Sequence, residues 1–387
     1  MLDYSVAEKL GHTFELGPIR PPSEAYSLLI RATRNCPWNR CQFCPVYKGS
    51  KFELRPVSEI LRDIEAVRAI SEGIKELAWK TGHGDRVRET AAMLCNQPQY
   101  GQCVSHVALW LATRGRTAFL QDSNSLIMRT PELIQVVSFL RSTFPNVDRV
   151  TTYARSHTAA RKSCTELKEL KDAGLDRIHM GLETGYDPLL AYMDKGCTAK
   201  NHVEGGTKAK EAGISLCEYV MPGLGGKKMS REHALGTARV LNEINPDYIR
   251  LRSLHVSPAM PLWAKFQEGD FELQTEDEVV EEIGLFIENL QVTSHLKSDH
   301  ILNLLMEVEG KMPGDKEKCL NVVNGYLSLA DDERLNFKIG RRAGLYNRLA
   351  DLRDNGKHEE VEQAIEQLRT RGADVEEAIV KLKNSFI

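Results

Sequence analysis

Three cysteines lie within nine residues, in the segment Cys36-Pro-Trp-Asn-Arg-Cys41-Gln-Phe-Cys44, shortly after the apolar run Ala25–Ile30. Thiolates bind iron–sulfur clusters and zinc alike. Three thiols are one fewer than a closed four-ligand site requires. On a four-iron, four-sulfur cluster they would leave one iron open to a ligand that is not protein. The spacing therefore indicates chemistry at an open iron rather than electron transfer alone.

A structural zinc site is the main alternative for these thiols. Such sites normally have four ligands, often in two Cys-x-x-Cys pairs. This segment has one such pair, Cys41 and Cys44, and the nearest downstream histidine is His83. A purely structural cluster is a further alternative. The remaining cysteines are scattered, and we interpret each as a small buried hydrophobic residue rather than a ligand: Cys95, Cys103, Cys164, Cys197, Cys217 and Cys319.

The composition is that of an ordinary soluble globular protein, with 387 residues, 42% of them hydrophobic and 27% charged. The net charge of −3 gives no electrostatic reason to expect nucleic acid as a partner. Acids and a base occupy the N-terminus where a signal peptide has an apolar core. No stretch has the apolar length of a membrane span. An odd number of cysteines, nine, argues against a disulfide framework. We expect a cytoplasmic protein.

Strand-like and helix-like segments alternate between residues 25 and 258. The predicted strands are 25–31, 117–121, 149–153, 177–182, 214–220 and 247–254. Apolar spacing and flanking proline or glycine signals predict helices at 57–74, 131–144, 158–172, 187–193, 199–212 and 230–244. Residues 84–112 form an inserted helical excursion in this prediction.

Six strands that alternate with helices predict an α/β fold with a parallel sheet. The periodicity leaves open whether the sheet is a partial barrel or an open, doubly wound sheet. After Pro258 the pattern becomes helical, with an amphipathic helix at 275–290 and a charged helical hairpin at 348–387 whose charges are solvated. The predicted organisation is an N-terminal segment (1–24), a barrel (25–260) and a C-terminal helical domain (261–387).

A strand that leads into a three-cysteine loop, with Phe43 just before the last cysteine, resembles the radical S-adenosylmethionine (SAM) superfamily. The common loop of that family has three residues in the first gap, whereas this one has four. The resemblance implies a partial (β/α)6 TIM-like barrel with a C-terminal all-helical extension. It also implies a 4Fe-4S cluster held by Cys36, Cys41 and Cys44, with SAM as second cofactor and Phe43 near its adenine. Within the superfamily the chain is most similar to the broad coproporphyrinogen-oxidase and Elongator-type group.

The same resemblance implies roles for polar residues that follow the predicted strands. Asp122 and Asn124 would accept from the methionyl amine of SAM, although an Asx-type turn explains them nearly as well. Ser156 would bond the ribose, or else begin a helix. Glu183, between two glycines, would contact the amine or ribose. Arg252 would anchor a carboxylate, or else form a structural ion pair.

A second polar group lies outside the predicted barrel. If residues 294–303 are helical, His295, Asp299 and Asn303 share one face and His300 points away from it. Buried polar residues that support helix packing explain this group slightly better than a substrate or cofactor contact.

The implied activity is that of a radical SAM enzyme. It cleaves SAM reductively to a 5′-deoxyadenosyl radical that abstracts hydrogen from a small or macromolecular substrate. A flavodoxin or ferredoxin would supply the electron. A non-catalytic carrier of a cluster, SAM or a tetrapyrrole on the same barrel is the second hypothesis, and a structural zinc protein with a helical interaction domain is the third. Formation of 5′-deoxyadenosine distinguishes the enzyme from the carrier.

Overall fold

The computed structural model describes residues 4–95, 97–370, 372 and 375–384. The chain divides into two compact units that alternate along the sequence. Unit 1 comprises residues 1–39, 46–180 and 204–216, and unit 2 comprises residues 40–45, 181–203 and 217–387. The predicted domain boundaries at residues 24 and 260 remain predictions.

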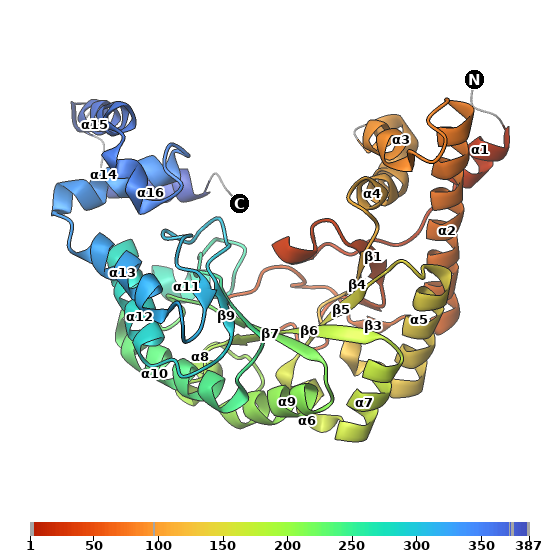
Figure 1. Cartoon of the computed structure of the whole chain (residues 1–387). Helices are drawn as coiled ribbons and strands as arrows, with labels where there is room; N and C mark the ends of the chain where they lie inside the picture. Colours follow the sequence, from red (N-terminus) through yellow and green to blue (C-terminus); the bar gives the residue numbers. More distant parts are fainter. Residues whose placement is uncertain (1–3, 96, 371, 373–374, 385–387) are drawn as a thin grey trace. The chain divides into compact units, whose positions relative to one another are not determined.

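Unit 1 contains the first parallel strands of the main sheet (Figure 1). These are β1 (Leu28–Arg31), β4 (Thr117–Gln121), β5 (Arg149–Ala154) and most of β6 (Leu175–Glu183), which are neighbours in that order. Leu28 and Ile30 of β1 are fully buried, as is Leu120 of β4. A separate antiparallel pair, β2 (Thr33–Arg34) and β3 (Glu53–Leu54), brackets the cysteine segment.

Amphipathic helices accompany these strands. The longest, α2 (Val57–Lys80), buries Ile60, Ile64, Val67, Ile70 and Ile74 at the spacing that predicted it. The inserted helical segment predicted at residues 84–112 is also present, as α3 and α4. The helices of this part of the chain are α1 (Tyr4–Leu10), α2, α3 (Val87–Leu94), α4 (Gly101–Ala112), α5 (Thr130–Thr143), α6 (Ser156–Arg161), α7 (Cys164–Asp172) and α9 (Ala199–Glu211), the last of which has residues in both units.

The single helix predicted at 158–172 is two helices. Lys162 and Ser163 have extended backbone angles, which end α6. Ser163 then begins α7 with a capping box, in which its side chain accepts from Glu166 N and the Glu166 side chain accepts from Ser163 N. The break is therefore a consequence of a strong local start signal inside a continuous apolar pattern.

Unit 2 contains most of β7 (Ser215–Val220), followed by β8 (Tyr248–Leu251), β9 (His295–Lys297) and β10 (Gly310–Lys311). β7, β8 and β9 are parallel, and β10 is antiparallel to β9. Two short strands thus lie in the region predicted to be all-helical. The helices are α8 (Asp187–Tyr192), α10 (Gly226–Ile244), α11 (Leu262–Gln267), α12 (Glu276–Glu288), α13 (Lys316–Leu327), α14 (Asp331–Arg342), α15 (Asn355–Thr370) and α16 (Val375–Asn384).

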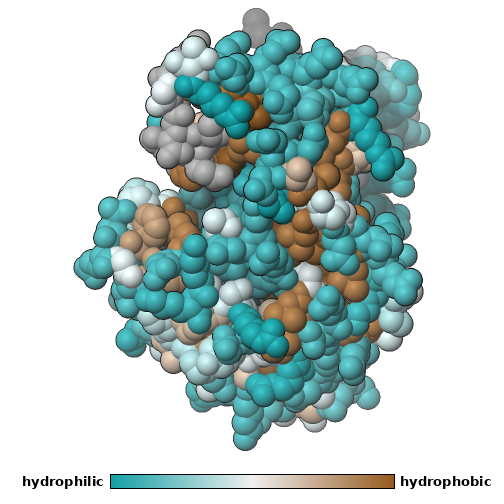
Figure 2. Space-filling model, turned by 90° about the vertical axis from the view of Figure 1, so that its left-hand side faces the viewer, coloured by the Kyte–Doolittle hydropathy of each residue, from teal (hydrophilic) through white to brown (hydrophobic). Residues whose placement is uncertain are grey.

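These elements confirm the predicted α/β class, a partial TIM-like barrel with a largely helical C-terminal extension. The helix α15 buries only Val361 and Ile365, in agreement with a solvated charged face. Figure 2, which views the side on the left of Figure 1, shows a mainly hydrophilic surface with narrower hydrophobic strips. Within the described residues, no helix has the length and apolar character needed to cross a membrane.

Candidate functional site

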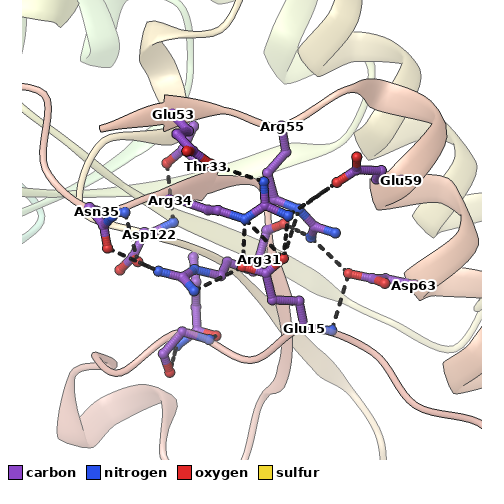
Figure 3. Close-up of polar contacts among 12 residues, drawn as sticks. Glu15, Arg31, Thr33, Arg34, Asn35, Glu53, Arg55, Glu59, Asp63 and Asp122 are labelled. Carbon is purple, nitrogen blue, oxygen red and sulfur yellow. Dashed lines mark hydrogen bonds and ion pairs between the residues drawn. The ribbon is translucent and has the colours of Figure 1, made fainter. Parts of the chain in front are cut away.

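The cysteine segment begins where β2 ends, and an ionic network in unit 1 holds that strand. Glu15 accepts from Arg34 at 2.6 and 2.8 Å and from Arg31 at 2.9 Å. Arg55 lies 3.3 Å from the same carboxylate and 2.7 Å from Asp63 (Figure 3). Arg34 belongs to β2 and Asp63 to α2, so the network joins the N-terminal segment, β2 and α2 two residues before Cys36.

Asp122 connects residues on both sides of the cysteine segment. Its fully buried carboxylate accepts from Arg31 Nη2 at 2.9 Å, from the backbone N–H of Asn35 at 3.3 Å, and from the hydroxyl of Tyr47. Asn35 precedes Cys36, and Tyr47 follows Cys44. Burial raises the pKa of Asp122, although Tyr47 and Arg31 oppose the shift. We call Arg31, Asn35, Tyr47 and Asp122 the loop clamp. A role for Asp122 as an amine acceptor remains a prediction.

Cys41 and Cys44 lie in a short stretch that belongs to unit 2. Gln42 between them donates from its backbone N–H to Met193 O at 2.9 Å and accepts from Leu262 N at 2.9 Å. Two backbone hydrogen bonds thus fix the stretch to unit 2 on both sides. All three thiols of the segment are half-buried and free of disulfides. Among the other cysteines, Cys217 and Cys319 are buried as predicted, whereas Cys164 is exposed, so that prediction was wrong for Cys164.

Phe43 is part of an apolar cluster in unit 2. Its ring is 8% exposed and packs in a group that includes Leu189, Met193, Leu254 and Leu262, with Cys41 and Cys44 at the edge of this group. Lys195 Nζ lies 5.3 Å from the centre of the Phe43 ring. The aromatic residue is therefore held in place beside two of the predicted ligands.

Asn124 and Ser156 occupy adjoining strand ends in unit 1. Asn124 follows β4, and its side chain donates to Thr158 Oγ1 at 2.9 Å and accepts from the backbone N–H of Arg155 at 3.1 Å. Ser156 is the buried first residue of α6, after β5. These contacts give Asn124 a structural role in joining the two strand ends. Their SAM contacts remain predictions.

Glu183 ends β6 in the left-handed region, with φ of 62°, which is uncommon for a residue with a side chain. Its carboxylate accepts from Lys195 Nζ at 3.0 Å. A Cβ on Gly181 would lie 2.2 Å from Glu183 Oε1 and 3.0 Å from Lys195 Nζ, so a side chain there would displace the end of the Glu183 side chain. This is the steric reason for the Gly-x-Glu pattern in the sequence.

Lys195 is a site residue that the sequence analysis missed. Burial lowers its pKa, but the carboxylate of Glu183 and the thiols of Cys41 and Cys197 outweigh burial, and the net pKa is raised. The ammonium group is therefore held in its charged form between a carboxylate and the sulfur atoms of unit 2.

Glu218 in β7 is a second residue that was missed. It is fully buried, and neither carboxyl oxygen has a hydrogen-bond partner among the described residues. Burial, followed by repulsion from Glu183, raises its pKa well above the ordinary value, while Lys195 opposes the shift. The folded protein therefore favours the protonated form of the Glu218 carboxyl group.

Arg252 follows β8 and forms the ion pair that was the alternative to a carboxylate anchor. Arg252 donates to Asp299 Oδ1 at 2.7 Å, and Arg250 donates to the other oxygen of the same carboxylate. The Arg252 guanidinium also lies 5.0 Å from the centre of the Tyr219 ring. One terminal nitrogen of Arg252 has no hydrogen-bond partner among the described residues, so it keeps a donor available.

The helix on which the His295 group depended does not form. Residues 295–297 are strand β9, and a loop follows. His295 stacks on Tyr248 with ring centres 5.5 Å apart. Asn303 accepts from Ser253 N at 3.0 Å, so it ties this loop to the end of β8. The prediction that His295, Asp299 and Asn303 share one helical face was therefore wrong.

Comparison with known proteins identifies the domain that contains these strand ends. Residues 151–238 match the family model of the radical SAM superfamily. The chain carries a radical SAM domain. The match includes Ser156 and Glu183, and the cysteine segment precedes it.

The curated relatives of this chain are distant. A tRNA uridine(34) acetyltransferase of Methanocaldococcus jannaschii is 21% identical over 280 residues, which are 69% of this chain and 49% of the relative. A biotin synthase of Clostridium botulinum is 25% identical over 36% of this chain and 45% of the relative. The chain spans about half the length of the curated relatives it matches. A solved methylornithine synthase matches 71% of this chain and 66% of its own, with 14% identity and a TM-score of 0.41.

The match confirms the predicted superfamily, and a 4Fe-4S cluster and SAM are the cofactors of radical SAM enzymes. The donor set of this chain fits both cofactors. Three thiols that form no disulfide suit a cluster with an open iron, and a backbone-fixed aromatic ring beside two of them suits an adenine. Among the described residues, no three cysteine, histidine or acidic side chains are already arranged around a metal position. Ligation by Cys36, Cys41 and Cys44 accordingly remains a prediction.

Proposed function

We propose that this chain is a radical SAM enzyme that holds a 4Fe-4S cluster through Cys36, Cys41 and Cys44. The observation that carries the proposal is the combination of a radical SAM domain with three half-buried thiols, none of them in a disulfide, in one short segment. Bound in this way, the cluster and SAM would supply reductive cleavage of SAM to methionine and a 5′-deoxyadenosyl radical, which would abstract hydrogen from the substrate. A small iron–sulfur or flavin protein such as ferredoxin or flavodoxin supplies the electron.

The side chains around SAM divide into contacts and supports. Phe43 provides an apolar face for the adenine, and Glu183, oriented by Lys195, accepts from the amine or ribose of SAM. Ser156 bonds the ribose, and the free donor of Arg252 binds a carboxylate. Asn124 holds the strand ends that carry Ser156, in addition to any contact with the amine.

Asp122 acts mainly through the cysteine segment in this proposal. Its carboxylate already accepts from three donors of the loop clamp, which supports a positioning role for the ends of the segment. A carboxylate with three charge-assisted or short contacts has little remaining capacity for an ammonium group. The two roles differ in outcome, because a positioning residue affects cluster content before it affects the binding of SAM.

The test is anaerobic. The protein is reconstituted with iron and sulfide, reduced with dithionite, mixed with SAM and assayed for 5′-deoxyadenosine. We expect product in the wild type and none in the Cys36→Ala/Cys41→Ala/Cys44→Ala variant. Cys95→Ala/Cys164→Ala is the matched control, because it removes thiols from partly or fully exposed positions outside the segment.

Each other outcome favours a different function. An intact cluster that binds SAM without product, with candidate substrates also present, would favour the carrier. Zinc without acid-labile sulfide in the purified protein would contradict the proposal and favour a structural metal site. Formation of 5′-deoxyadenosine would be followed by a search for the substrate.

A further inference from the structure

A buried polar network in unit 2 joins the two turns that follow β6 and β7. We call residues 184–186 the β6 turn and residues 221–225 the β7 turn. The network contains His233 of α10 and Glu282 of α12, which are 1% and 4% exposed. Figure 1 shows these two helices beside each other, in agreement with their contacts. Side chains this deeply buried depend on partners within the protein for their hydrogen bonds.

His233 binds one turn with each of its ring nitrogens. Its Nδ1 shares a hydrogen bond of 2.8 Å with the hydroxyl of Thr184 in the β6 turn, and its Nε2 lies 3.1 Å from the carbonyl oxygen of Met221 in the β7 turn. A carbonyl oxygen can only accept, so Nε2 donates the hydrogen of the second bond. Met221 in turn donates from its backbone N–H to Glu183 O at 3.0 Å. One imidazole thus holds both the residue that follows Glu183 and the residue that binds its carbonyl.

Glu282 and Thr237 fix the backbone of the same two turns. Glu282 Oε1 accepts from Gly223 N in the β7 turn at 2.8 Å and lies 3.5 Å from His233 Nε2. Thr237, which is fully buried in α10, accepts from Gly185 N in the β6 turn at 3.0 Å. Each turn is therefore tied to the helices by a backbone N–H as well as through His233.

The β6 turn also approaches α10 closely. A Cβ on Gly185 would lie 2.4 Å from the carbonyl oxygen of Gly236 in that helix, and a Cβ on Gly236 would lie 3.3 Å from Gly185 O. The cavity beside His233 and Glu282 has a volume of about 10 Å³, room for one water molecule at most. The packing and the small cavity indicate a support for the turns rather than a pocket for a ligand.

The residue that this support surrounds is Glu183. Its left-handed φ of 62° is a conformation that a residue with a side chain keeps only where its surroundings impose it. We propose that His233 and Glu282 are positioning residues, which hold the two turns so that Glu183 keeps the conformation in which it contacts SAM. The inference rests on the proposed function, because the contact between Glu183 and SAM belongs to that proposal. His233 and Glu282 act through Glu183 and through the backbone of the β7 turn rather than by touching SAM.

The first test uses the iron-free protein, so it is independent of both cofactors. Amide hydrogen exchange, followed by mass spectrometry of peptides that cover the two turns, compares the wild type with His233→Leu, which removes both bonds of the ring. We expect exchange about tenfold faster in both turns of this variant, because local opening becomes easier. His233→Gln keeps an N–H group near the position of Nε2, so it should restore slow exchange in the β7 turn.

The second test measures the affinity for SAM by equilibrium dialysis after reconstitution, together with the iron content. His233→Leu should keep the iron content of the wild type and weaken SAM binding about tenfold (about 1.4 kcal/mol), and His233→Gln should recover part of this loss. Ser294→Ala is the matched control, because it removes a buried hydrogen bond of unit 2, to the carbonyl of Pro246, outside both turns. It should bind SAM as the wild type does, even where its unfolding temperature falls.

If His233→Leu fails to fold, Thr237→Val is the second variant. Valine keeps the shape of threonine and removes the acceptor of Gly185 N, so we expect faster exchange in the β6 turn and severalfold weaker SAM binding. Wild-type exchange or wild-type SAM affinity in the variant that folds would overturn the inference, as would an equal loss of affinity in Ser294→Ala. A wild type that does not bind SAM contradicts the proposed function as a whole, whereas unaffected variants beside a wild type that binds SAM contradict only this inference.

Discussion

The buried Glu218 allows a quantitative test of the electrostatics of unit 2. Glu218→Gln keeps the shape of the side chain and removes its ability to ionise. Because neither carboxyl oxygen has a hydrogen-bond partner in the described part of the chain, the buried polar group costs about 1 to 3 kcal/mol in any state, and ionisation adds to this cost. Glutamine retains the first cost and avoids the second.

The sign of the pH dependence follows from the raised pKa of Glu218. A carboxyl whose pKa is higher in the folded state binds its proton more tightly there than in the unfolded chain. Its protonation therefore stabilises the fold fully below the unfolded pKa of about 4.3, and this stabilisation is lost as the pH rises towards the folded pKa. The wild type should be as stable as Glu218→Gln near pH 4, and the variant should become the more stable protein between pH 5 and 8.

The assay is urea unfolding of the reduced, iron-free protein at several pH values, followed by circular dichroism. The expected difference in the free energy of unfolding grows with pH to at least about 1 kcal/mol, since each unit of pKa shift corresponds to about 1.4 kcal/mol. Glu268→Gln removes the same charge from an exposed position and serves as the control. A difference between wild type and Glu218→Gln that is independent of pH, or a variant that loses stability as the pH rises, would refute this reasoning.

Three other substitutions test the supports of the site. Asp122→Asn should lower the free energy of unfolding, measured in urea, by about 1 to 3 kcal/mol, because Arg31 and Tyr47 lose a charged acceptor. The same change should reduce the amount of iron bound after reconstitution. Iron content equal to that of the wild type would argue against the loop clamp. Gly181→Ala should weaken SAM binding about tenfold in equilibrium dialysis (about 1.4 kcal/mol), since its Cβ would displace Glu183, whereas Gly314→Ala should not. Ser163→Ala should cost about 1 kcal/mol of stability, measured by thermal unfolding, through loss of the capping box of α7.

Local sequence signals account well for the secondary structure of both units. The strand predicted at 117–121 has the observed bounds of β4, and the helix predicted at 199–212 ends one residue later than α9. The break at Ser163 was missed although Ser163-x-x-Glu166 is a start signal, because the apolar spacing continues through it. β9 was missed because three residues with two polar side chains carry almost no strand pattern; its identity depends on pairing with β8.

The candidate site was only partly predictable because its supports come from distant parts of the chain. Tyr47 and Arg31 reach Asp122 across 75 and 91 residues, a separation at which no local pattern carries information. The sequence does contain a signal for Glu218, because it is a single acid inside the otherwise largely apolar strand Ser-Leu-Cys-Glu-Tyr-Val.

Charge balance extends this argument to the C-terminal helices. In the sequence, Arg341 and Arg342 form an unremarkable basic pair at the end of a helix, where the helix dipole favours cations. The fold buries both but provides a carboxylate to Arg342 alone. Which buried charge receives an acidic partner is therefore decided by the tertiary structure and not by the local sequence.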